Sequence, residues 1–588
     1  MTASLVPATI AFLDETPYST AFDDVYHSAA GGPAQAEHVF LRGNGLPQRW
    51  AGRERFVVLE TGFGLGLNFL VTLQAWRRNP GTKLHYVSVE KHPFTLHDLQ
   101  TLHQRYPSLR EEAAELHSVW PMLLSGGHRA ELDQGRVVLT LFFADIKVLR
   151  DLRLSADAIY LDGFSPAKNP DMWSSQVMRA VSRLAAPEAT AATWSVATEV
   201  RASLERVGFA VEKRAGFGHK KEMLVARNTR QTGILPERKN KEALVVGAGL
   251  AGAAICERLC ARGWQVELVE RHAAPAQEAS GNPAGAFHPV VTPDDSLFAR
   301  LTRAGFLFSL NKWKSLGSVR WDQCGLLQLA RDEREAASQG NAVDGLPREY
   351  AQVLTREEAS AHAGVPAAAG GVWFPEAGWI DPPSLVRAQL EACGAQLKRQ
   401  FGKELKELPA DRIVILANSF DAPKLQPVPH LRLRRVRGQL TYVPAQDFSP
   451  PRVVLLRGGM VLPPVDGACV VGASFDIDDA DPAPRAESHA GNLERLARIV
   501  PFAAELKNLQ GRVAFRSVTP DRLPVVGAIT ENVYGAFAYG SRGLVWAALA
   551  AELIASHLEG EPLPLEGKLV DALSPLRFRM RAGETNDD

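Results

Sequence analysis

Three glycines and one glutamate near the middle of the chain have the spacing of a nucleotide-binding site. Gly247, Gly249 and Gly252 follow an apolar run and open a helical pattern in KEALVVGAGLAGAAICERLCARGWQVELVER, and Glu270 ends the next apolar run. Glycines at such a turn let a helix N-terminus approach a pyrophosphate, and an acid about 20 residues further on can accept both ribose hydroxyls. The alternative is a tight turn without a ligand. Because strand, turn, helix and acid occur in order, we predict an adenine-dinucleotide site.

A second glycine loop lies in the N-terminal half, in RFVVLETGFGLGLN. Its residues of interest are Glu60, Gly62, Gly64 and Gly66. The two following predicted strands end at Glu90 and Asp145. The loop resembles motif I of class I S-adenosylmethionine methyltransferases, and this resemblance implies that it contacts the methionine part of the cofactor, with Glu90 at the ribose and Asp145 near the adenine. Acids and glycines at the carboxyl ends of successive strands predict a ligand-binding crevice, although each acid alone could be a helix cap or a surface charge.

The fourth predicted strand runs into LDGFSPAKNPDMW, which occupies the place of methyltransferase motif IV. Asp162 at this strand end can orient an amine and accept its proton as the nitrogen attacks a methyl group. Phe164 would shape a dry slot for the methyl group, and Lys168 would face the substrate. Because Asp-Gly and Ser-Pro both form turns, an N-cap and turn without a catalytic role is the alternative.

Two further segments of the C-terminal half extend the nucleotide-site prediction. They are QEASGNPAGAFHP and YGSRGLVWAAL, which contain Ser280, Gly281, Asn282, Gly540, Ser541, Arg542 and Gly543. Together with VVGAGLAG, they resemble the D-amino-acid oxidase and glycine oxidase group of FAD enzymes. The resemblance implies FAD rather than NAD. A helix N-terminus aimed at the flavin would stabilise negative charge on its reduced ring.

Three segments of the N-terminal half, TPYSTAFDDVYHS, ETGFGLGLNFL and LDGFSPAKNPDMW, resemble the MnmC family of bifunctional enzymes that modify the wobble uridine of tRNA. The resemblance implies an FAD-dependent half that removes the carboxymethyl group of 5-carboxymethylaminomethyl-2-thiouridine. The other half would then methylate the resulting amine with S-adenosylmethionine, with Asp162 as the catalytic residue. It also implies that residues 18–37 lie over the methyl donor.

Oxidation of a carboxymethylamine needs a positioned cation for the carboxylate, and a bidentate guanidinium suits this task. We expect Arg516, in FRSVTPDR, to fill this catalytic role and name Arg437, before Gly438, as a second substrate-binding candidate. For either arginine, the alternative is a structural ion pair.

The expected fold class is α/β, with a class I Rossmann-like methyltransferase domain followed by a two-lobed FAD-binding unit. We place these domains at residues 1–230 and 243–588, joined by a linker at 231–242, where NTRQTGILPERKNK interrupts the apolar pattern. A substrate lobe at about 297–480 would be inserted into the FAD-binding lobe.

Composition narrows the classes of function. The 588 residues carry 66 basic and 66 acidic side chains, a formal net charge of zero that argues against indiscriminate nucleic-acid binding but allows local basic surfaces for tRNA. No apolar run approaches a membrane span, and the five scattered cysteines suit a reducing cytoplasm. We expect a monomer without a metal. The remaining alternatives are an enzyme with both cofactors that acts on free amino acids or small amines, and a cofactor-holding scaffold without activity.

Overall fold

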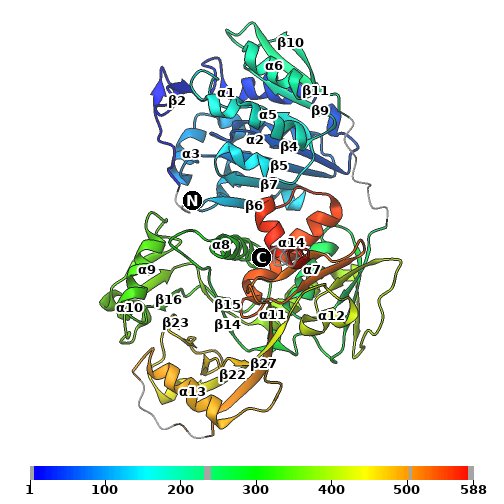
Figure 1. Ribbon diagram of the computed structural model, residues 1–588. Helices are drawn as coiled ribbons and strands as arrows, with labels where there is room; N and C mark the ends of the chain where they lie inside the picture. The colour runs from blue at the N-terminus through cyan, green and yellow to red at the C-terminus, as the bar shows by residue number, and fades with distance from the viewer. Residues whose placement is uncertain (1–4, 231–239, 502–505, 507, 580–588) are drawn as a thin grey trace, which may run out of the picture. The chain divides into compact units, whose positions relative to one another are not determined.

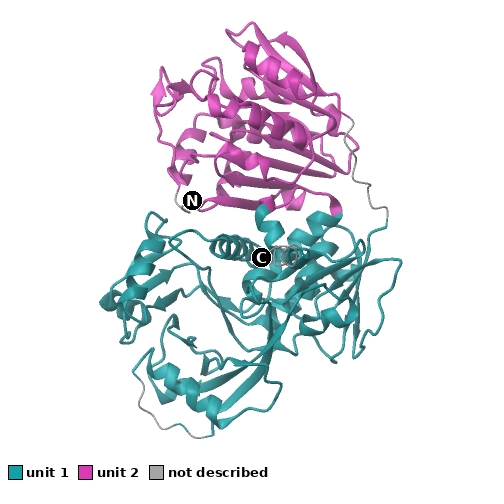
Figure 2. Ribbon diagram, in the orientation of Figure 1, with its two compact units in different colours: residues 1–2, 238–558, 568–588 teal, residues 3–237, 559–567 magenta. Residues whose placement is uncertain are grey.

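Short apolar runs form the central strands of both halves of the chain. In β7 (Val137–Phe143), all seven residues of VVLTLFF are buried, and β21 (Ile413–Leu416) is buried along its whole length. Such strands suit parallel sheets, because helices cover both faces. The computed structural model describes residues 5–230, 240–501, 506 and 508–579. It divides into an N-terminal unit (residues 3–237 and 559–567) and a C-terminal unit (residues 1–2, 238–558 and 568–588), coloured in Figure 2.

The N-terminal unit is built on an eight-stranded sheet in the order β10-β11-β9-β8-β4-β5-β7-β6 (Figure 1). The neighbouring strands from β9 to β7 are parallel, and the outer strands are antiparallel. The other strands of this sheet are β4 (Arg55–Glu60), β5 (Lys83–Glu90), β6 (Gly126–Leu132), β8 (Ala156–Tyr160), β9 (Ala185–Thr193), β10 (Phe209–Ala215) and β11 (Glu222–Asn228). The helices are α1 (Gly32–Gln35), α2 (Leu67–Arg78), α3 (Leu96–His103), α4 (Arg110–Ser118), α5 (Ser175–Leu184) and α6 (Thr198–Arg206).

Alternation along β4 divides the core of this unit between the two faces of the sheet. Phe56 and Val58 belong to one apolar cluster, and Val57 and Leu59 belong to another. Because successive strand residues point to opposite faces, Glu60 continues the row of Phe56 and Val58. A small sheet of β1 (Phe12–Leu13), β2 (Thr16–Ser19) and β3 (Asp24–Val25) precedes this core.

A short segment from near the chain's end also belongs to the N-terminal unit. Within residues 559–567, the Leu563 amide donates to the Arg153 carbonyl at 3.1 Å, and Glu561 forms an ion pair with Lys83 at 3.2 Å. Only 2% of the Glu561 side chain is exposed, and its Oε1 lies 3.5 Å from Nε2 of the buried His85. This segment was expected in the FAD-binding domain, whereas its backbone hydrogen bond and its ion pair with Lys83 place it with the N-terminal sheet.

The C-terminal unit contains a six-stranded sheet in the order β20-β13-β12-β21-β29-β28, parallel except for the last pair. Its strands are β12 (Glu242–Val246), β13 (Gln265–Glu270), β20 (Leu397–Phe401), β21, β28 (Val525–Ala528) and β29 (Val533–Phe537). Its helices include α7 (Leu250–Cys260), α11 (Pro382–Ala392), α12 (Ala422–Leu425), α14 (Gly543–Glu559) and α15 (Gly567–Leu573).

A nine-stranded sheet forms the second lobe of this unit. Its order is β17-β18-β16-β23-β24-β25-β22-β26, and β27 also pairs with β22. The strands are β16 (Leu326–Leu329), β17 (Gln352–Leu354), β18 (Gly371–Phe374), β22 (Arg434–Pro444), β23 (Val454–Leu456), β24 (Met460–Val461), β25 (Ala468–Gly472), β26 (Asp476–Ile477) and β27 (Gln510–Val518). The helices that pack on this lobe are α9 (Glu333–Val343), α10 (Arg356–Ala363) and α13 (Ala486–Ala497). Helix α8 (Leu297–Ser315) instead contacts α14, where the Ser309 hydroxyl donates to the Leu544 carbonyl at 3.3 Å. A separate sheet joins β14 (Gly285–Phe287), β15 (Trp321–Asp322) and β19 (Gly378–Ile380).

The second lobe is less contiguous than the predicted insertion at 297–480. Inside that range, β20 and β21 return to the six-stranded sheet, because β21 pairs in parallel with both β12 and β29. Beyond the range, β27 pairs with β22 over nine residues of the second lobe. The chain therefore crosses between the lobes more often than the sequence suggested.

Candidate active sites

A cavity of about 800 Å³ lies at the carboxyl ends of the parallel strands of the N-terminal unit. Among the predicted site residues, it is lined by Gly62, Gly64, Glu90, Asp145, Asp162 and Phe164. Three other predicted residues, Glu60, Gly66 and Lys168, do not line it. The strands β4, β5, β7 and β8 thus bring residues that are about 100 positions apart in sequence to one edge of the sheet, as expected for this topology.

The glycine loop is fixed to the end of the neighbouring strand by Glu90. The carboxylate of Glu90 accepts hydrogen bonds from the amides of Gly64 and His92, both at 2.8 Å. Gly64 has φ +51°, a conformation that a residue with a Cβ rarely adopts. This arrangement holds the loop open and presents the carboxylate to the cavity.

Asn68, on the wall of this cavity, connects two carboxyl groups. Its Nδ2 donates to Oε1 of Glu60 at 2.9 Å and to Oδ2 of Asp162 at 2.7 Å. Glu60 is fully buried, accepts a second hydrogen bond from the Ser88 hydroxyl at 2.7 Å, and lies outside the cavity lining. Glu60 thus lies outside the cavity, where it orients Asn68, whereas the glycine motif suggested a direct contact with the cofactor.

Burial raises the pKa of both carboxyl groups. The pKa of Glu60 rises to about 8, first through burial and then through the nearby charge of Asp162. The pKa of Asp162 rises to about 6, again mainly through burial, although the Asn68 amide and the Gly163 N–H, at 2.8 Å, oppose the rise. At neutral pH, Asp162 is therefore mostly ionised, with a basicity close to the optimum for a general base.

Aromatic residues form another part of the cavity wall. Phe164 stacks on Phe22 with 4.7 Å between ring centroids, and Tyr26 meets Phe164 edge-on at 5.2 Å. Phe22 and Tyr26 belong to the N-terminal segment expected to lie over the methyl donor, and residues 19–22, 24–28 and 32 line the cavity. Lys168 forms an ion pair with Asp23 of this segment, which explains its place outside the lining.

Two further residues of this cavity were not identified from the sequence. Trp194 follows β9, and its side chain interacts with Asp162 so as to lower the carboxyl pKa. Lys220 Nζ lies 3.5 Å from the centroid of the Trp194 ring, and burial lowers the pKa of this ammonium. A hairpin position for Lys220 could be read from the sequence, but its contact with Trp194 depends on the pairing of β9 with β11.

The C-terminal unit has a cavity of about 1070 Å³. Among the predicted site residues, it is lined by Gly247, Gly249, Glu270, Ser280, Asn282, Gly540, Ser541, Arg542, Gly543 and Arg516, whereas Gly252, Gly281 and Arg437 lie outside the lining. At Gly252, a Cβ would lie 1.8 Å from the Gly247 carbonyl oxygen, so this glycine permits the close approach of α7 to the loop. The Ser280 hydroxyl accepts a hydrogen bond from the Leu250 amide at the start of α7, at 3.0 Å.

Glu270 repeats the geometry of Glu90. Its carboxylate accepts hydrogen bonds from the amides of Ala248, at 2.8 Å, and of His272, at 2.9 Å. In both units, the acid at the end of the second strand thus binds one amide of the glycine loop and the amide two residues further along its own chain. The remaining lone pairs of each carboxylate can accept the two hydroxyls of a ribose.

Several buried polar atoms on the wall of the C-terminal cavity have no hydrogen-bond partner among the described residues. They are Asn282 Oδ1, Asn418 Oδ1, Ser517 Oγ and Tyr539 OH. An unpaired buried polar atom is costly, and its presence on a cavity wall indicates a ligand that supplies the missing partner. Together with the glycine loop and Glu270, these atoms fit a large polar cofactor of the FAD type.

Arg516 and Arg437 have different surroundings although both were candidates for carboxylate binding. Arg516 lines the cavity, its guanidinium donates to the Ser474 carbonyl at 3.3 Å, and burial lowers its pKa. Gly438 leaves the space for this guanidinium, since a Cβ there would lie 2.6 Å from Nη2. Arg516 therefore keeps donors that can receive a substrate carboxylate.

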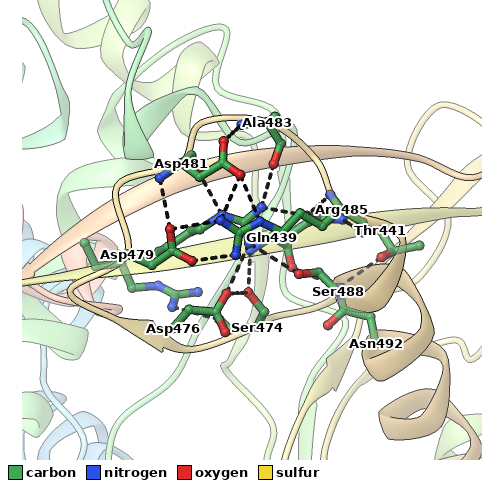
Figure 3. Close-up of polar contacts among 12 residues, drawn as sticks. Gln439, Thr441, Ser474, Asp476, Asp479, Asp481, Ala483, Arg485, Ser488 and Asn492 are labelled. Atoms are coloured by element: carbon green, nitrogen blue, oxygen red, sulfur yellow. Dashed lines mark hydrogen bonds and ion pairs between the residues drawn. The ribbon is translucent and has the colours of Figure 1, made fainter.

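Arg437 is fully buried in a network outside the cavity and does not support the substrate-binding role expected for it. Its guanidinium donates to Asp476, Ser488 and Gln439 and to the carbonyls of Asp481 and Ala483, at 2.6–3.3 Å. The contacts among these loop residues, with Asp479 and Arg485, are drawn in Figure 3. With its donors used in this way, Arg437 fixes the loop that follows β25.

A buried arginine and histidine complete the C-terminal cavity. Burial lowers the pKa of Arg542 to about 10, and its guanidinium carbon lies 5.7 Å from the Phe298 ring centroid. Burial, and then the Arg542 charge, lower the pKa of His288 to about 3, so this imidazole is neutral. Nδ1 of His288 lies 2.7 Å from the Pro289 carbonyl, which can only accept a hydrogen bond. Nδ1 therefore carries the proton, and the unprotonated Nε2 can accept a hydrogen bond.

The described residues include no helix long and apolar enough to cross a membrane. They also include no group of three or more histidine, cysteine, aspartate or glutamate side chains arranged to hold a metal ion. Oligomeric state and cellular compartment stay predictions.

Comparison with known proteins assigns each half of the chain to an enzyme class. Residues 242–557 match the family described as FAD dependent oxidoreductase, and residues 107–229 match the family described as S-adenosyl-L-methionine-dependent methyltransferase. These matches confirm the predicted FAD and S-adenosylmethionine cofactors and the predicted α/β fold class of the two halves.

Two relatives match nearly the whole chain, and both are named tRNA 5-methylaminomethyl-2-thiouridine biosynthesis bifunctional protein MnmC. The protein from Paraburkholderia phytofirmans is 45% identical over 652 aligned positions, with 99% of both chains covered. The protein from an Azoarcus species is 46% identical over 628 positions, also with 99% of both covered. Among solved structures, glycine oxidase from Bacillus cereus is 19% identical with a TM-score of 0.47, covering 55% of this chain and 98% of its own.

Proposed function

Because the chain belongs to the MnmC family of bifunctional tRNA-modification proteins, we propose that its two cavities act in turn on one wobble uridine of tRNA. The C-terminal cavity would convert 5-carboxymethylaminomethyl-2-thiouridine to 5-aminomethyl-2-thiouridine. The N-terminal cavity would then methylate the new amine to give 5-methylaminomethyl-2-thiouridine. One observation carries this proposal: a single chain combines a cavity with a carboxylate-binding guanidinium and a cavity with a carboxylate base of suitable pKa.

In the first step, the residues of the C-terminal cavity bind and orient the carboxymethylamine. Arg516 binds the substrate carboxylate, and the neutral His288 presents Nε2 as an acceptor for the proton of the secondary amine. FAD, when bound, supplies a two-electron acceptor for the hydride of the methylene group. Addition of water to the oxidised carbon–nitrogen bond releases the arm as glyoxylate and leaves a primary amine. Glu270, Ser280 and Asn282 would hold the cofactor.

In the second step, the residues of the N-terminal cavity orient the amine and remove its proton. S-adenosylmethionine, when bound, supplies the electrophilic methyl group, and Glu90 with the glycine loop would hold it. Asn68 fixes the Asp162 carboxylate so that one oxygen can accept the proton of the attacking nitrogen. The stacked rings of Phe164 and Phe22 keep water from the transferred methyl group.

The alternative is an enzyme with both cofactors that acts on free amino acids or small amines. The buried guanidinium of Arg516 can bind the carboxylate of either substrate, so this residue does not distinguish the two functions. A full-length relative named for a tRNA pathway favours the RNA substrate.

The proposal can be tested on tRNA from a strain that lacks this protein. The purified chain with FAD would be incubated with this tRNA, with and without S-adenosylmethionine, and nucleosides analysed by mass spectrometry. We expect loss of the carboxymethyl mass without the methyl donor, and gain of one methyl group with it. An unchanged wobble uridine, together with flavin reduction by free glycine or sarcosine, would support the small-amine alternative.

A further inference from the structure

Phe475 combines exposure with a place at the mouth of the C-terminal cavity. Its relative exposure is 58%, and it lines the cavity. Among the described residues, no other large apolar side chain that is exposed lines this cavity. An exposed aromatic ring on a cavity wall offers a flat apolar face on which another ring can stack. The residues around Phe475 therefore indicate which chemical groups such a ligand carries.

Strand register places Phe475 on the same face of the sheet as Arg516. Strand β22 pairs Val436 with Ile477 on one side and with Arg516 on the other. Side chains alternate along an extended chain, so Phe475, which directly precedes β26, is expected on the face of Ile477, whereas Asp476 faces the opposite way. The contact agrees with this register: the guanidinium carbon of Arg516 lies 5.9 Å from the Phe475 ring centroid.

The backbone around Phe475 is held in place although its ring is exposed. The Ser474 hydroxyl accepts a hydrogen bond from the Gln439 amide at 3.1 Å and donates to Asp476 at 2.8 Å. Arg437 also binds Asp476, at 3.1 Å. Figure 3 shows Ser474, Asp476 and Gln439 converging in this network. The chain on both sides of Phe475 is therefore fixed before any ligand arrives, which reduces the entropy lost on binding.

We propose that Phe475 is the surface on which the pyrimidine base of the substrate stacks while Arg516 binds its carboxylate. This inference rests on the proposed function. In the carboxymethylaminomethyl arm, four single bonds separate the carboxylate carbon from the base, which corresponds to roughly 5 Å in an extended arm. With its carboxylate on Arg516, this arm is long enough to bring the base within reach of the Phe475 ring, whose centroid lies 5.9 Å from the guanidinium carbon. A free small amine has no ring to cover Phe475.

Stacking gives this position a specific energetic role. A base taken out of the anticodon stack loses its neighbours, and an aromatic side chain replaces part of that stacking whichever base it meets. Phe475 is thus a specificity-determining residue that favours a nucleoside over a small amine, and it does not take part in the redox step. Its loss should affect the binding of substrate more than the chemical rate.

The test compares Phe475→Ala, Phe475→Leu and Phe475→Trp in the full-length holoenzyme, with tRNA that carries the carboxymethylaminomethyl group. We expect Phe475→Ala to raise KM for the oxidative step roughly 10- to 100-fold, in line with the measured contribution of base–aromatic stacking, with kcat changed less than about threefold. Phe475→Trp should restore KM, whereas Phe475→Leu, which is apolar but not aromatic, should not. Phe401→Ala is the matched control, because Phe401 is 36% exposed but lies outside the cavity lining.

Two further readouts separate the possible causes. Flavin content reports whether the C-terminal unit is intact, and methylation of aminomethyl-tRNA by the same preparation should be unchanged. If the wild-type chain leaves tRNA unmodified, the proposed function fails and this inference fails with it. If the wild-type chain acts on tRNA and Phe475→Ala matches it in KM, only the stacking role is wrong. The same conclusion holds if Phe475→Leu restores KM as well as Phe475→Trp does.

Discussion

Replacement of Asp162 by asparagine tests the proton-transfer step of the N-terminal cavity most directly. The substitution keeps the shape of the side chain but removes its charge and basicity. In the wild type, Oδ1 accepts from the Gly163 amide at 2.8 Å and Oδ2 accepts from Asn68 at 2.7 Å. Since both partners are donors, the new amide group opposes one of them, and the side chain can no longer take a proton.

The expected loss can be worked out from the contacts of Asp162. A positioned general base contributes about 10²- to 10⁴-fold to the rate. Its negative charge also stabilises the positive charge that develops on the attacking nitrogen, by about 4 kcal/mol for charges 4 Å apart at an effective dielectric constant of 20. These are two descriptions of overlapping effects, so we expect a fall of about 10³-fold in the single-turnover rate of methylation.

The pH dependence gives a second, independent readout. With a pKa of about 6, Asp162 loses its proton as the pH rises, so the wild-type kcat/KM should fall tenfold per pH unit below about pH 6. The asparagine variant should lack this acidic limb, although a limb from the substrate amine remains in both enzymes.

The assay is transfer of an isotopically labelled methyl group to aminomethyl-tRNA, under single-turnover conditions with saturating S-adenosylmethionine. Oxidation of carboxymethylaminomethyl-tRNA by the same preparation should be unchanged and serves as an internal control. Asp98→Asn, in α3 and outside the cavity lining, is the matched substitution. A variant at Asp162 that keeps more than about a tenth of the wild-type rate, with the limb near pH 6 intact, would refute the base role.

Three further predictions concern other charged groups. The pKa of Glu60 in the folded chain, about 8, exceeds its ordinary value of 4.5, so the stability that protonated Glu60 contributes is lost as the pH rises from about 4.5 to 8. Glu60→Gln should remove this pH-dependent loss, which amounts to at most about 5 kcal/mol of unfolding free energy. An equal pH dependence of urea unfolding in both proteins would contradict this. Arg516→Lys should raise KM for the carboxymethylamine roughly 10- to 100-fold in steady-state oxidation, because a single ammonium replaces a bidentate guanidinium. Arg437→Lys should instead lower the melting temperature, with KM of the folded protein unchanged. Glu561→Ala should destabilise the N-terminal unit by roughly 3 kcal/mol, because it removes the buried carboxylate that forms an ion pair with Lys83. Calorimetry that shows no earlier transition would exclude this effect.

The glycine loops and the acids at strand ends were predictable because their signal is local. Gly247, Gly249 and Glu270 are fixed by one strand–turn–helix–strand unit, and the structure places all three on the cavity wall. Asn68 was missed although it touches Asp162, because the two residues are 94 positions apart and meet only when β4 and β8 pair. Glu60, in contrast, was predicted to contact the cofactor but lies outside the cavity lining. Its motif suggested a cofactor contact, but strand alternation turns its side chain to the row of Phe56 and Val58 and into the core.

The two arginine candidates show why the choice between similar motifs requires strand register. Arg437 and Arg516 lie on adjacent antiparallel strands, but Arg437 pairs with Phe515, and Arg516 pairs with Val436. They are therefore one position out of step, and their side chains leave opposite faces of the sheet. A shift of one residue in the pairing of β22 with β27 would bring both to the same face. Nothing in either local sequence encodes this register, since it depends on β22 pairing with β25, β26 and β27 together. The same register sets Phe475 beside Arg516, so the assignment of the carboxylate-binding residue and that of the stacking surface depend on one structural fact.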